Sequence, residues 1–229
     1  MEIRIDSLIE GATRAKGTVV IVDVFRAFTT AAIAFLQGAE KIILVSNIQE
    51  ALELRRQGIG DLCIGEVGGV QPIGFDFGNS PFELSSSDIR NKTLIQSTRA
   101  GIVGANTAQN ADTIYLCSLV CASETAKEIS RQQPNLVTIV AMGAEGKIRT
   151  DEDEQCALYL RNLLQGRSPD PNAVRSLILS GESSAQFDNL DLPQFHPEDR
   201  EIALRINSAA LSIKANMEEK FLVARSKRP

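Results

Sequence analysis

The stretch TVVIVDVFRAFTTAAIAFLQG, from Thr18 to Gly38, decides the fold. Its first part, Thr18–Val22, is an apolar, β-branched run of the kind that forms strands buried on both faces of a sheet. Asp23 follows this run, and Ala27–Gln37 then reads as a helix that Gly38 closes. A buried strand followed at once by a helix predicts a βαβ unit and a parallel sheet.

The same alternation of strand and helix continues along the chain. Two further helices are predicted, at Ile48–Gln57 behind Asn47 as N-cap and at Val120–Gln132 behind Ser118. The alternation implies βαβ crossovers, so we expect a three-layer α/β/α fold with a mainly parallel or mixed sheet. The further strands are predicted from short apolar runs at Lys41–Val45, Leu62–Ile64, Thr93–Gln96, Thr113–Cys117 and Leu136–Met142.

The C-terminal third has a different pattern. From Glu152 onward the sequence predicts mostly helix, and Phe221–Ala224 predicts a last strand. Gly181–Pro197, rich in Ser, Asp and Pro, predicts an exposed connection and is the one candidate internal linker. We expect residues 1–229 to form a single α/β domain. The helical prediction rests on apolar residues at Leu160, Leu163 and Leu164 in one stretch and at Ile202, Ile206, Ala209 and Ile213 in another.

Composition narrows the class of protein. The chain is 43% hydrophobic and 23% charged, as in ordinary globular proteins. No apolar run approaches the roughly 20 residues that cross a bilayer, and Met1–Asp6 does not resemble a secretory signal, so we expect a cytoplasmic protein that does not engage membranes. A net charge of −5 provides no basic field for nucleic acid. The four cysteines form no Cys-x-x-Cys pair, which favours reduced, buried thiols over structural zinc.

Polar residues follow several predicted strands, and the carboxyl ends of parallel strands are where ligands bind in open α/β sheets. Asp23 follows a wholly apolar run, where a carboxylate is costly to bury without a partner or a metal. It is a candidate magnesium ligand or nucleophile, and the alternative is an N-cap for the helix at Ala27. Arg26 could hold an anion in a bidentate fork, and the alternatives are a salt bridge with Asp23 or a charge on the protein surface. Gly143-Ala144-Glu145-Gly146 adds Glu145 after another strand.

Two more segments contribute to this rim. Gly65–Pro81 holds five glycines and two prolines, which predicts a long ordered loop. Within it, Glu66 and Asp76 are candidate metal ligands and Asn79 and Ser80 hydrogen-bonding partners, or else ordinary turn residues. The segment Ser97-Thr98-Arg99-Ala100-Gly101 at a strand-to-helix junction suits a phosphate or sulfonate, with an ordinary turn and a solvent-facing Arg99 as the alternative.

The run Asp151-Glu152-Asp153-Glu154 opens a predicted helix, where acidic residues are favoured by the helix dipole. Four adjacent carboxylates also repel each other, which a divalent cation would relieve. The lone histidine, His196, is expected to be structural. The chain lacks a Gly-x-x-x-x-Gly-Lys-[Ser/Thr] loop and a Gly-x-Ser-x-Gly elbow, which argues against kinase-like and esterase-like chemistry. It also lacks the cysteine-dependent phosphatase motif and the second aspartate of the haloacid-dehalogenase signature.

Taken together, three motifs resemble the 2-phosphosulfolactate phosphatase family over most of the chain. They are Asp23-Val24-Phe25-Arg26-Ala27, Gly74–Pro81, and Gly143–Gly146 followed by Glu152–Ala157. The resemblance implies Mg²⁺-dependent hydrolysis of 2-phospho-3-sulfolactate to 3-sulfolactate and phosphate, a step towards coenzyme M. It implies a small phosphorylated acid as the partner, with neither nucleic acid nor membrane, and a homodimer remains open.

When the roles of the family's residues are carried over by position, the resemblance implies a set of acidic metal-binding residues. It also implies that Arg26 and Arg99 hold anionic groups. One departure bears on the substrate, because many relatives have Asn-Gly-Thr where this chain has Arg99-Ala100-Gly101. Two rival functions therefore remain: hydrolysis of another small phosphorylated acid, and anion binding without catalysis. The attacking group also stays open between a metal-activated water and Asp23. The implied acidic set is Asp23, Glu66, Asp76, Glu152 and Asp153, and the implied substrate-binding set is Asn79, Ser80, Ser97, Thr98 and Glu145.

Overall fold

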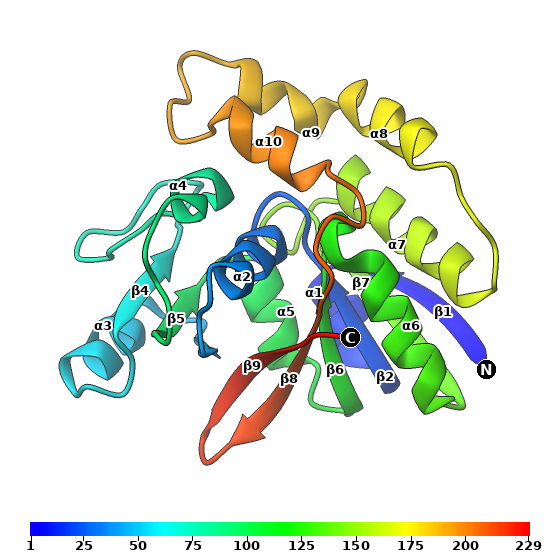
Figure 1. Ribbon diagram of the computed structural model, residues 1–229, viewed down its shortest axis with the longest axis horizontal. Coiled ribbons are helices and arrows are strands. Elements are labelled where there is room, and N and C mark those ends of the chain that lie inside the picture. The colour runs from blue at the N-terminus through cyan, green and yellow to red at the C-terminus, as the bar shows by residue number, and fades with distance from the viewer.

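The computed structural model describes residues 1–229 and contains one nine-stranded sheet in the order β1-β7-β2-β6-β8-β9-β3-β5-β4. Helices cover both faces of this sheet (Figure 1). The α/β prediction is confirmed, with a mixed, mostly parallel sheet. The strands are β1 Glu2–Ser7, β2 Gly17–Val22, β3 Lys41–Leu44, β4 Leu62–Gly65, β5 Thr93–Ser97, β6 Ala111–Cys117, β7 Leu136–Ala141, β8 Ser212–Glu218 and β9 Phe221–Lys227.

Ten α-helices connect and flank the strands. The N-cap expected at Asn47 is confirmed, because its side chain accepts the N–H groups of Gln49 and Glu50. Short 3₁₀ turns at Leu119–Cys121 and Gln186–Asp188 precede α6 and follow α9. The helices are α1 Leu8–Arg14, α2 Ala27–Leu36, α3 Ile48–Arg56, α4 Pro81–Ser85, α5 Gly101–Thr107, α6 Ala122–Gln132, α7 Asp151–Leu164, α8 Pro171–Leu179, α9 Glu182–Ala185 and α10 Pro197–Ala203.

The sheet consists of two parallel parts joined by an antiparallel hairpin. One part is β1-β7-β2-β6 and the other is β3-β5-β4. The hairpin β8–β9 lies between them and pairs antiparallel with β6 on one side and with β3 on the other. The last two strands of the chain therefore occupy the middle of the sheet.

The sheet is strongly curved, which brings the ends of distant strands together. Four strands separate β2 from β5, a distance of about 24 Å along a flat sheet. Nevertheless the Gly101 N–H, just after β5, donates to Asp23 Oδ2 just after β2, at 2.9 Å. In Figure 1, α2 and α5 lie between β5 and β2. Curvature thus places the carboxyl ends of both parallel parts around one space.

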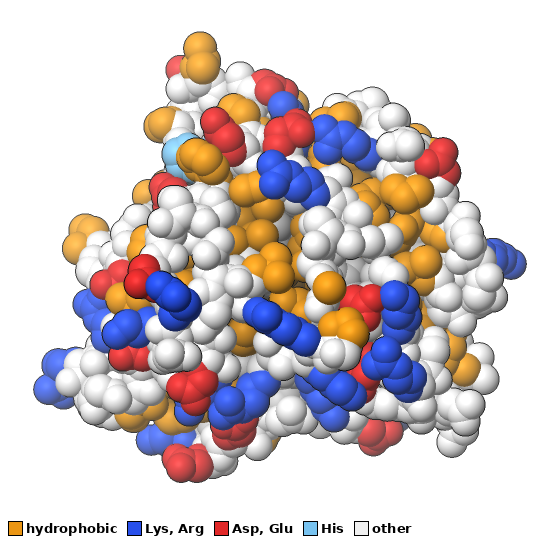
Figure 2. All heavy atoms as spheres, viewed as in Figure 1, with side chains coloured by type: hydrophobic (Ala, Val, Ile, Leu, Met, Phe, Trp, Pro, Cys, Tyr) orange, Lys and Arg blue, Asp and Glu red, His pale blue; other side chains and the backbone are white.

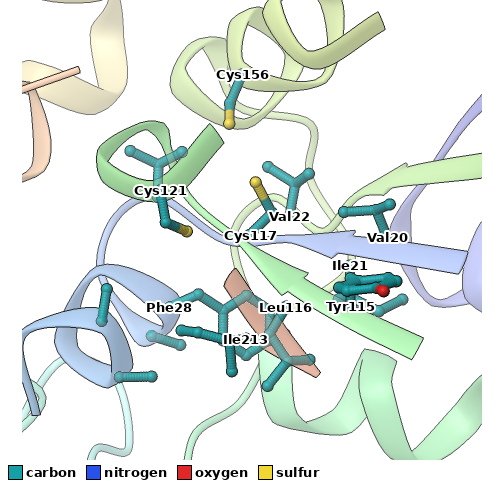
Figure 3. Packing of buried hydrophobic residues seen from close by; sticks show 14 of the residues in the cluster. Val20, Ile21, Val22, Phe28, Tyr115, Leu116, Cys117, Cys121, Cys156 and Ile213 are labelled. Atoms are coloured by element: carbon teal, nitrogen blue, oxygen red, sulfur yellow. The ribbon is translucent and has the colours of Figure 1, made fainter. Parts of the chain in front are cut away.

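Helix α2 is apolar on nearly every side, which suits its position between the two parts. Eight of its ten residues are buried, and the Gln96 side chain of β5 donates to the Ala27 carbonyl oxygen at its start. Figure 3 shows Phe28 of α2 next to Leu116 and Ile213 in the core. All four cysteines are free and buried, as expected, and Cys117 of β6 and Cys156 of α7 point toward one another.

The C-terminal predictions need correction. Ile202, Ile206, Ala209 and Ile213 do not share one helix: α10 ends at Ala203, and Ile213 lies in β8. Pairing on both sides, with β6 and β9, overrides the helical spacing of the apolar residues. Gly181–Pro197 is not a simple exposed linker either, because it forms α9 and a 3₁₀ turn and buries Ser184 and Phe187. Strand β1 was not predicted at all.

Basic residues near the C-terminus have hydrogen-bonding or ionic partners. Arg225 of β9 forms a salt bridge with Glu218, and Lys227 forms one with the buried Glu128 of α6. On the face drawn in Figure 2, basic side chains along the lower part have acidic side chains beside them. None of the helices combines the length and apolar character needed to cross a membrane.

Candidate active site

A cavity of about 250 Å³ lies at the carboxyl ends of the strands, where both parts of the curved sheet meet. It receives residues that follow β2, β4, β5 and β7, the first turn of α7, and the segment before α10. Only four of its eighteen lining residues are hydrophobic. The polar residues lining it are Asp23, Arg26, Glu66, Asn79, Thr98, Arg99, Glu145, Thr150, Glu152, Ser183 and Gln186.

Asp23 lines this cavity and is almost fully buried. Its Oδ1 accepts the Ala27 N–H and its Oδ2 accepts the Gly101 N–H, both at 2.9 Å. The N-cap of α2 is Arg26, not Asp23, although Asp23 binds the first N–H of the helix. Burial, followed by the charges of Glu66 and Glu152, raises the pKa of Asp23 to about 7, although the two N–H groups act in the opposite direction. The group can therefore gain or lose a proton near neutral pH.

Gly101 permits the close approach to Asp23. A Cβ at residue 101 would lie 2.7 Å from Asp23 Oδ2 and 2.9 Å from the Phe28 ring. Any side chain at this position would push against the carboxylate. Gly101 thus meets a local packing requirement of this chain.

The four acidic residues that open α7 point in different directions, because successive side chains project from different sides of a helix. Asp151 and Glu154 point outward, where Asp151 accepts the Glu182 N–H and Glu154 pairs with Arg149. Glu152 and Asp153 are buried, and burial raises the pKa of both. Asp153 accepts the Val24 N–H at 2.7 Å and the Gly143 N–H at 2.8 Å.

Asp153 therefore joins the loops after β2 and β7 from behind the cavity wall, without lining the cavity itself. We call Asp23, Glu152 and Asp153 the acidic cluster. Neighbouring carboxyl charges contribute to the raised pKa values of Asp23 and Asp153. No lysine or arginine lowers the pKa of any of the three carboxyl groups.

Among the residues that line the cavity, Asn79 has a buried oxygen, Oδ1, without a hydrogen-bond partner. Glu152 Oε2 and Ser183 Oγ are also buried, and they have no partner apart from the interaction of the Ser183 hydroxyl with Glu152. Buried polar atoms in native proteins are nearly always paired, so unpaired ones mark a place where a ligand or water completes the structure. Only four other buried side-chain atoms in the whole chain lack a partner. The cavity thus concentrates unsatisfied oxygen atoms.

Glu66 ties together two loops at the cavity. Its Oε2 accepts the Gly69 N–H and its Oε1 accepts the Arg99 N–H, both at 2.8 Å. The Arg99 side chain is exposed and lines the cavity with Thr98. Arg99 is thus accessible to an anionic group that enters from solvent.

Arg26 also lines the cavity, but it does not pair with Asp23. Its Nη1 donates to Asp199 Oδ2 and to the Gln194 carbonyl oxygen, both at 2.7 Å, and its Nη2 donates to the Gly69 carbonyl oxygen at 3.2 Å. Its guanidinium carbon lies 4.7 Å from the centre of the Phe195 ring. The salt bridge with Asp23 that the sequence offered as an alternative is wrong.

Several residues expected at the site lie outside the cavity lining. Asp76 pairs with Arg55 at 2.6 Å and accepts the Cys63 N–H, so it joins α3 to β4. Ser80 caps α4 and donates to Asp199, and Ser97 is buried at the end of β5. Glu145 lines the cavity, but its side chain is 58% exposed and lies 3.6 Å from Lys147.

Sequence reasoning missed Asp199, Ser183, Gln186 and Phe195. The last three lie in the segment interpreted as a linker, and Asp199 stands in the first turn of α10, where an acidic residue needs no special explanation. His196 is not among the residues that line the cavity; it precedes α10, and its Nε2 lies 3.1 Å from Glu83 Oε1. The aromatic cluster of Phe25, Phe187 and Phe195 was the available signal.

No three His, Cys, Asp or Glu side chains are grouped so that they alone could hold a metal ion. The buried thiols are not candidates for the chemistry, because burial raises the pKa of Cys156 and raises that of Cys63 to about 11. The candidate ligands and reactive groups of the cavity are therefore the oxygen atoms of carboxylates, side-chain amides and hydroxyls.

Comparison with known proteins identifies the family of this chain. A family model described as 2-phosphosulpholactate phosphatase matches residues 3–190. Proteins named probable 2-phosphosulfolactate phosphatase include one from Bacillus subtilis, 33% identical over 79% of this chain and 78% of its own length. Those from Carboxydothermus hydrogenoformans and a Cyanothece species are 38% and 37% identical, over 64% and 60% of this chain and 60% and 57% of their own lengths. The chain therefore belongs to the 2-phosphosulfolactate phosphatase family.

Proposed function

We propose that this chain is a Mg²⁺-dependent phosphatase that hydrolyses 2-phospho-3-sulfolactate to 3-sulfolactate and phosphate. One observation carries the proposal: buried carboxyl groups without a cationic partner border the same cavity as two arginines. A phosphate monoester with a bound cation supplies both missing charges. The names of the relatives support phosphate monoester hydrolysis, and the size and polarity of the cavity suit a small acid.

The residues present fit a magnesium ion in their chemistry. Mg²⁺ prefers oxygen ligands and is usually held by one or two carboxylates, with waters and substrate phosphate completing its shell. The unpaired Asn79 Oδ1 and the Glu152 carboxylate, which has no cationic partner, offer such ligands, and Asp23 and Glu66 border the same space. When bound, the ion would offset negative charge on the acidic cluster and on the phosphoryl oxygens.

The two arginines would bind the anionic groups of the substrate. Arg26 is held rigidly by three hydrogen bonds, which suits the phosphoryl group whose position determines the reaction. Arg99 is exposed at the cavity edge and would hold the sulfonate or carboxylate end. Phe25 and Phe195 line the cavity too and limit the access of water.

Asp23 would carry the central chemical role. Its pKa of about 7 leaves it able to hold or release a proton at physiological pH. Two routes use this group. In the first, the carboxylate attacks phosphorus, the P–O ester bond breaks so that the sulfolactate oxygen leaves and takes up a proton, and water then hydrolyses the acyl phosphate to phosphate and free Asp23. In the second, Asp23 takes a proton from the attacking water while the ester oxygen leaves and is protonated. Hydroxylamine would trap the acyl phosphate on the first route and leave Asp23 unmodified on the second.

A phosphate-release screen over small organic phosphates tests the function. We expect the fastest release from 2-phospho-3-sulfolactate, loss of activity after EDTA treatment, and recovery on addition of Mg²⁺. A faster reaction with another small phosphorylated acid would change the substrate but keep the phosphatase. Phosphate binding without release from any ester would replace the proposal with a non-catalytic anion-binding module, and full activity of the metal-free chain would exclude the metal dependence.

A further inference from the structure

The Arg26–Asp199 pair lies beside the cavity and joins residues 173 positions apart in the chain. Both side chains are almost fully buried, at 2% and 0% exposed. Arg26 lines the cavity, whereas Asp199 does not. Asp199 also lies beyond residues 3–190, the region that the family model matches.

Asp199 uses both carboxylate oxygens in separate directions. Oδ2 accepts from Arg26 Nη1 at 2.7 Å, while Oδ1 accepts from the Ser80 hydroxyl at 2.6 Å and the Phe82 N–H at 2.9 Å. One oxygen therefore serves the guanidinium and the other holds the start of α4. This division allows one interaction to be removed without the other.

The surroundings of Arg26 leave its guanidinium little freedom. Three of its five N–H groups are occupied by Asp199, Gln194 and Gly69, and one face lies over the Phe195 ring. The two remaining N–H groups, one on Nε and one on Nη2, have no partner in the protein, and Arg26 lines the cavity. The charge of Arg26 is already balanced by Asp199, so orientation matters more than net charge for what Arg26 can do.

We propose that Asp199 is a positioning residue for the phosphatase reaction, because it holds the Arg26 guanidinium in the orientation in which its two remaining N–H groups meet a phosphoryl oxygen. The inference rests on the proposed function. It assigns part of the site's support to the C-terminal segment, which closes back over the cavity through Gln194, Phe195 and Asp199. A guanidinium left without Asp199 would sample other orientations and bind the anion less well.

Asp199→Asn is the informative variant. The asparagine oxygen can still accept from Ser80 and Phe82, but its NH₂ group then faces Arg26 Nη1, donor against donor. We expect inorganic phosphate, titrated calorimetrically in the presence of Mg²⁺, to bind about 10- to 100-fold more weakly. The kcat/KM for an aryl phosphate should fall by a similar factor.

A double-mutant cycle separates positioning from general support. In an Arg26→Ala background, adding Asp199→Asn should change phosphate affinity by less than about twofold, because the residue through which Asp199 acts is gone. Asp188→Asn is the matched control: it breaks the Asp188–Arg200 pair in the same segment without touching a residue that lines the cavity, and should leave phosphate affinity unchanged.

Equal losses from Asp199→Asn in both backgrounds, or wild-type phosphate affinity in the single variant, would overturn the proposal. If Asp199→Asn does not fold, Arg26→Lys decides, since it keeps a cation beside Asp199 but lacks the planar fork; affinity within twofold of wild type would then overturn it. If the wild type binds phosphate but releases none from any phosphate ester, the phosphatase function is refuted. The coupling between Arg26 and Asp199 can then still be measured through phosphate affinity. A wild type that binds no phosphate refutes both.

Discussion

The acidic cluster and the Arg26–Asp199 pair are buried to a similar degree beside one cavity, yet the protein treats their charges in opposite ways. Asp199 receives three donors and a full counter-charge. Asp23, Glu152 and Asp153 receive backbone N–H groups or a hydroxyl, but no cation. A buried charge that is neutralised internally supports the structure, whereas one left without a counter-charge marks where a ligand is expected.

The largest expected effect comes from Asp23→Asn. The change removes an uncompensated buried charge and keeps an acceptor for one of the two N–H groups that Asp23 binds, so turnover should fall about 10³-fold or more while the protein stays folded. Thermal stability should stay the same or rise. The measurement is steady-state kinetics with melting curves. A variant that keeps more than about a tenth of wild-type kcat would show that Asp23 is only a helix cap, and the contrast between the two regions would disappear.

The second prediction concerns pH and stability in the metal-free chain. The folded chain holds the Asp23 proton more tightly than the unfolded chain does, so the free energy of unfolding should fall as pH rises from about 4 to about 7. The contribution of this group over that window is roughly 4 kcal/mol as an upper bound. Urea titrations of wild type and Asp23→Asn should therefore diverge with rising pH, the variant being the more stable at pH 8.

Mg²⁺ sharpens the same experiment. If the acidic cluster binds a cation, added Mg²⁺ should raise the melting temperature of the wild type at pH 8 much more than that of Asp23→Asn. If the free energies of unfolding of wild type and Asp23→Asn changed in parallel with pH, the charge of Asp23 would not be the destabilising one.

A smaller and more selective effect is expected at Arg99. Its side chain is exposed, unlike that of Arg26, so Arg99→Ala should leave folding unchanged. The kcat/KM for a substrate with a second anionic end should fall about 10- to 150-fold through loss of a charge-assisted hydrogen bond, while an aryl phosphate should be almost unaffected. Equal losses on both substrates would assign Arg99 to the phosphoryl group, and no loss on either would leave it as a solvent-facing residue.

The smallest effect is expected at Asp76, an acidic residue with a cationic partner outside the cavity. Asp76→Asn weakens the contact with Arg55 but keeps an acceptor for the Cys63 N–H, so kcat should stay within about twofold of wild type. A large loss of activity would mean that Asp76 belongs to the metal-binding set after all, and that pairing with a cation does not separate structural from functional carboxylates here.

The region around β2 was accessible to sequence reasoning because its signals are local, whereas β1 was missed. Strand β2, the helix after it and Asp23 at their junction all follow from residues that are neighbours in the sequence. The same reasoning found Glu66 after β4 and Arg99 after β5, because strand ends of a parallel sheet share one edge.

The C-terminal part was less predictable because tertiary contacts decide it. Ile213 has helical spacing to its apolar neighbours but belongs to a strand that pairs with β6, about a hundred residues earlier. Asp76 looked like a ligand because its loop is rich in glycine, and only the position of Arg55 on α3 shows its partner. Asp199 could not be distinguished from an ordinary acidic residue near a helix start until Arg26 was seen to face it.

The central position of the β8–β9 hairpin also has a consequence for biosynthesis. Ile42 of β3 pairs with Ala224 of β9, so the two parallel parts have no strand between them until the ribosome has delivered these late residues. Contacts of such high sequence separation are slow to form, because a long loop must close first. A nascent chain that has not yet released residues 212–227 would hold two separate sheet edges, at β6 and β3, and each edge would be open to pairing with other chains.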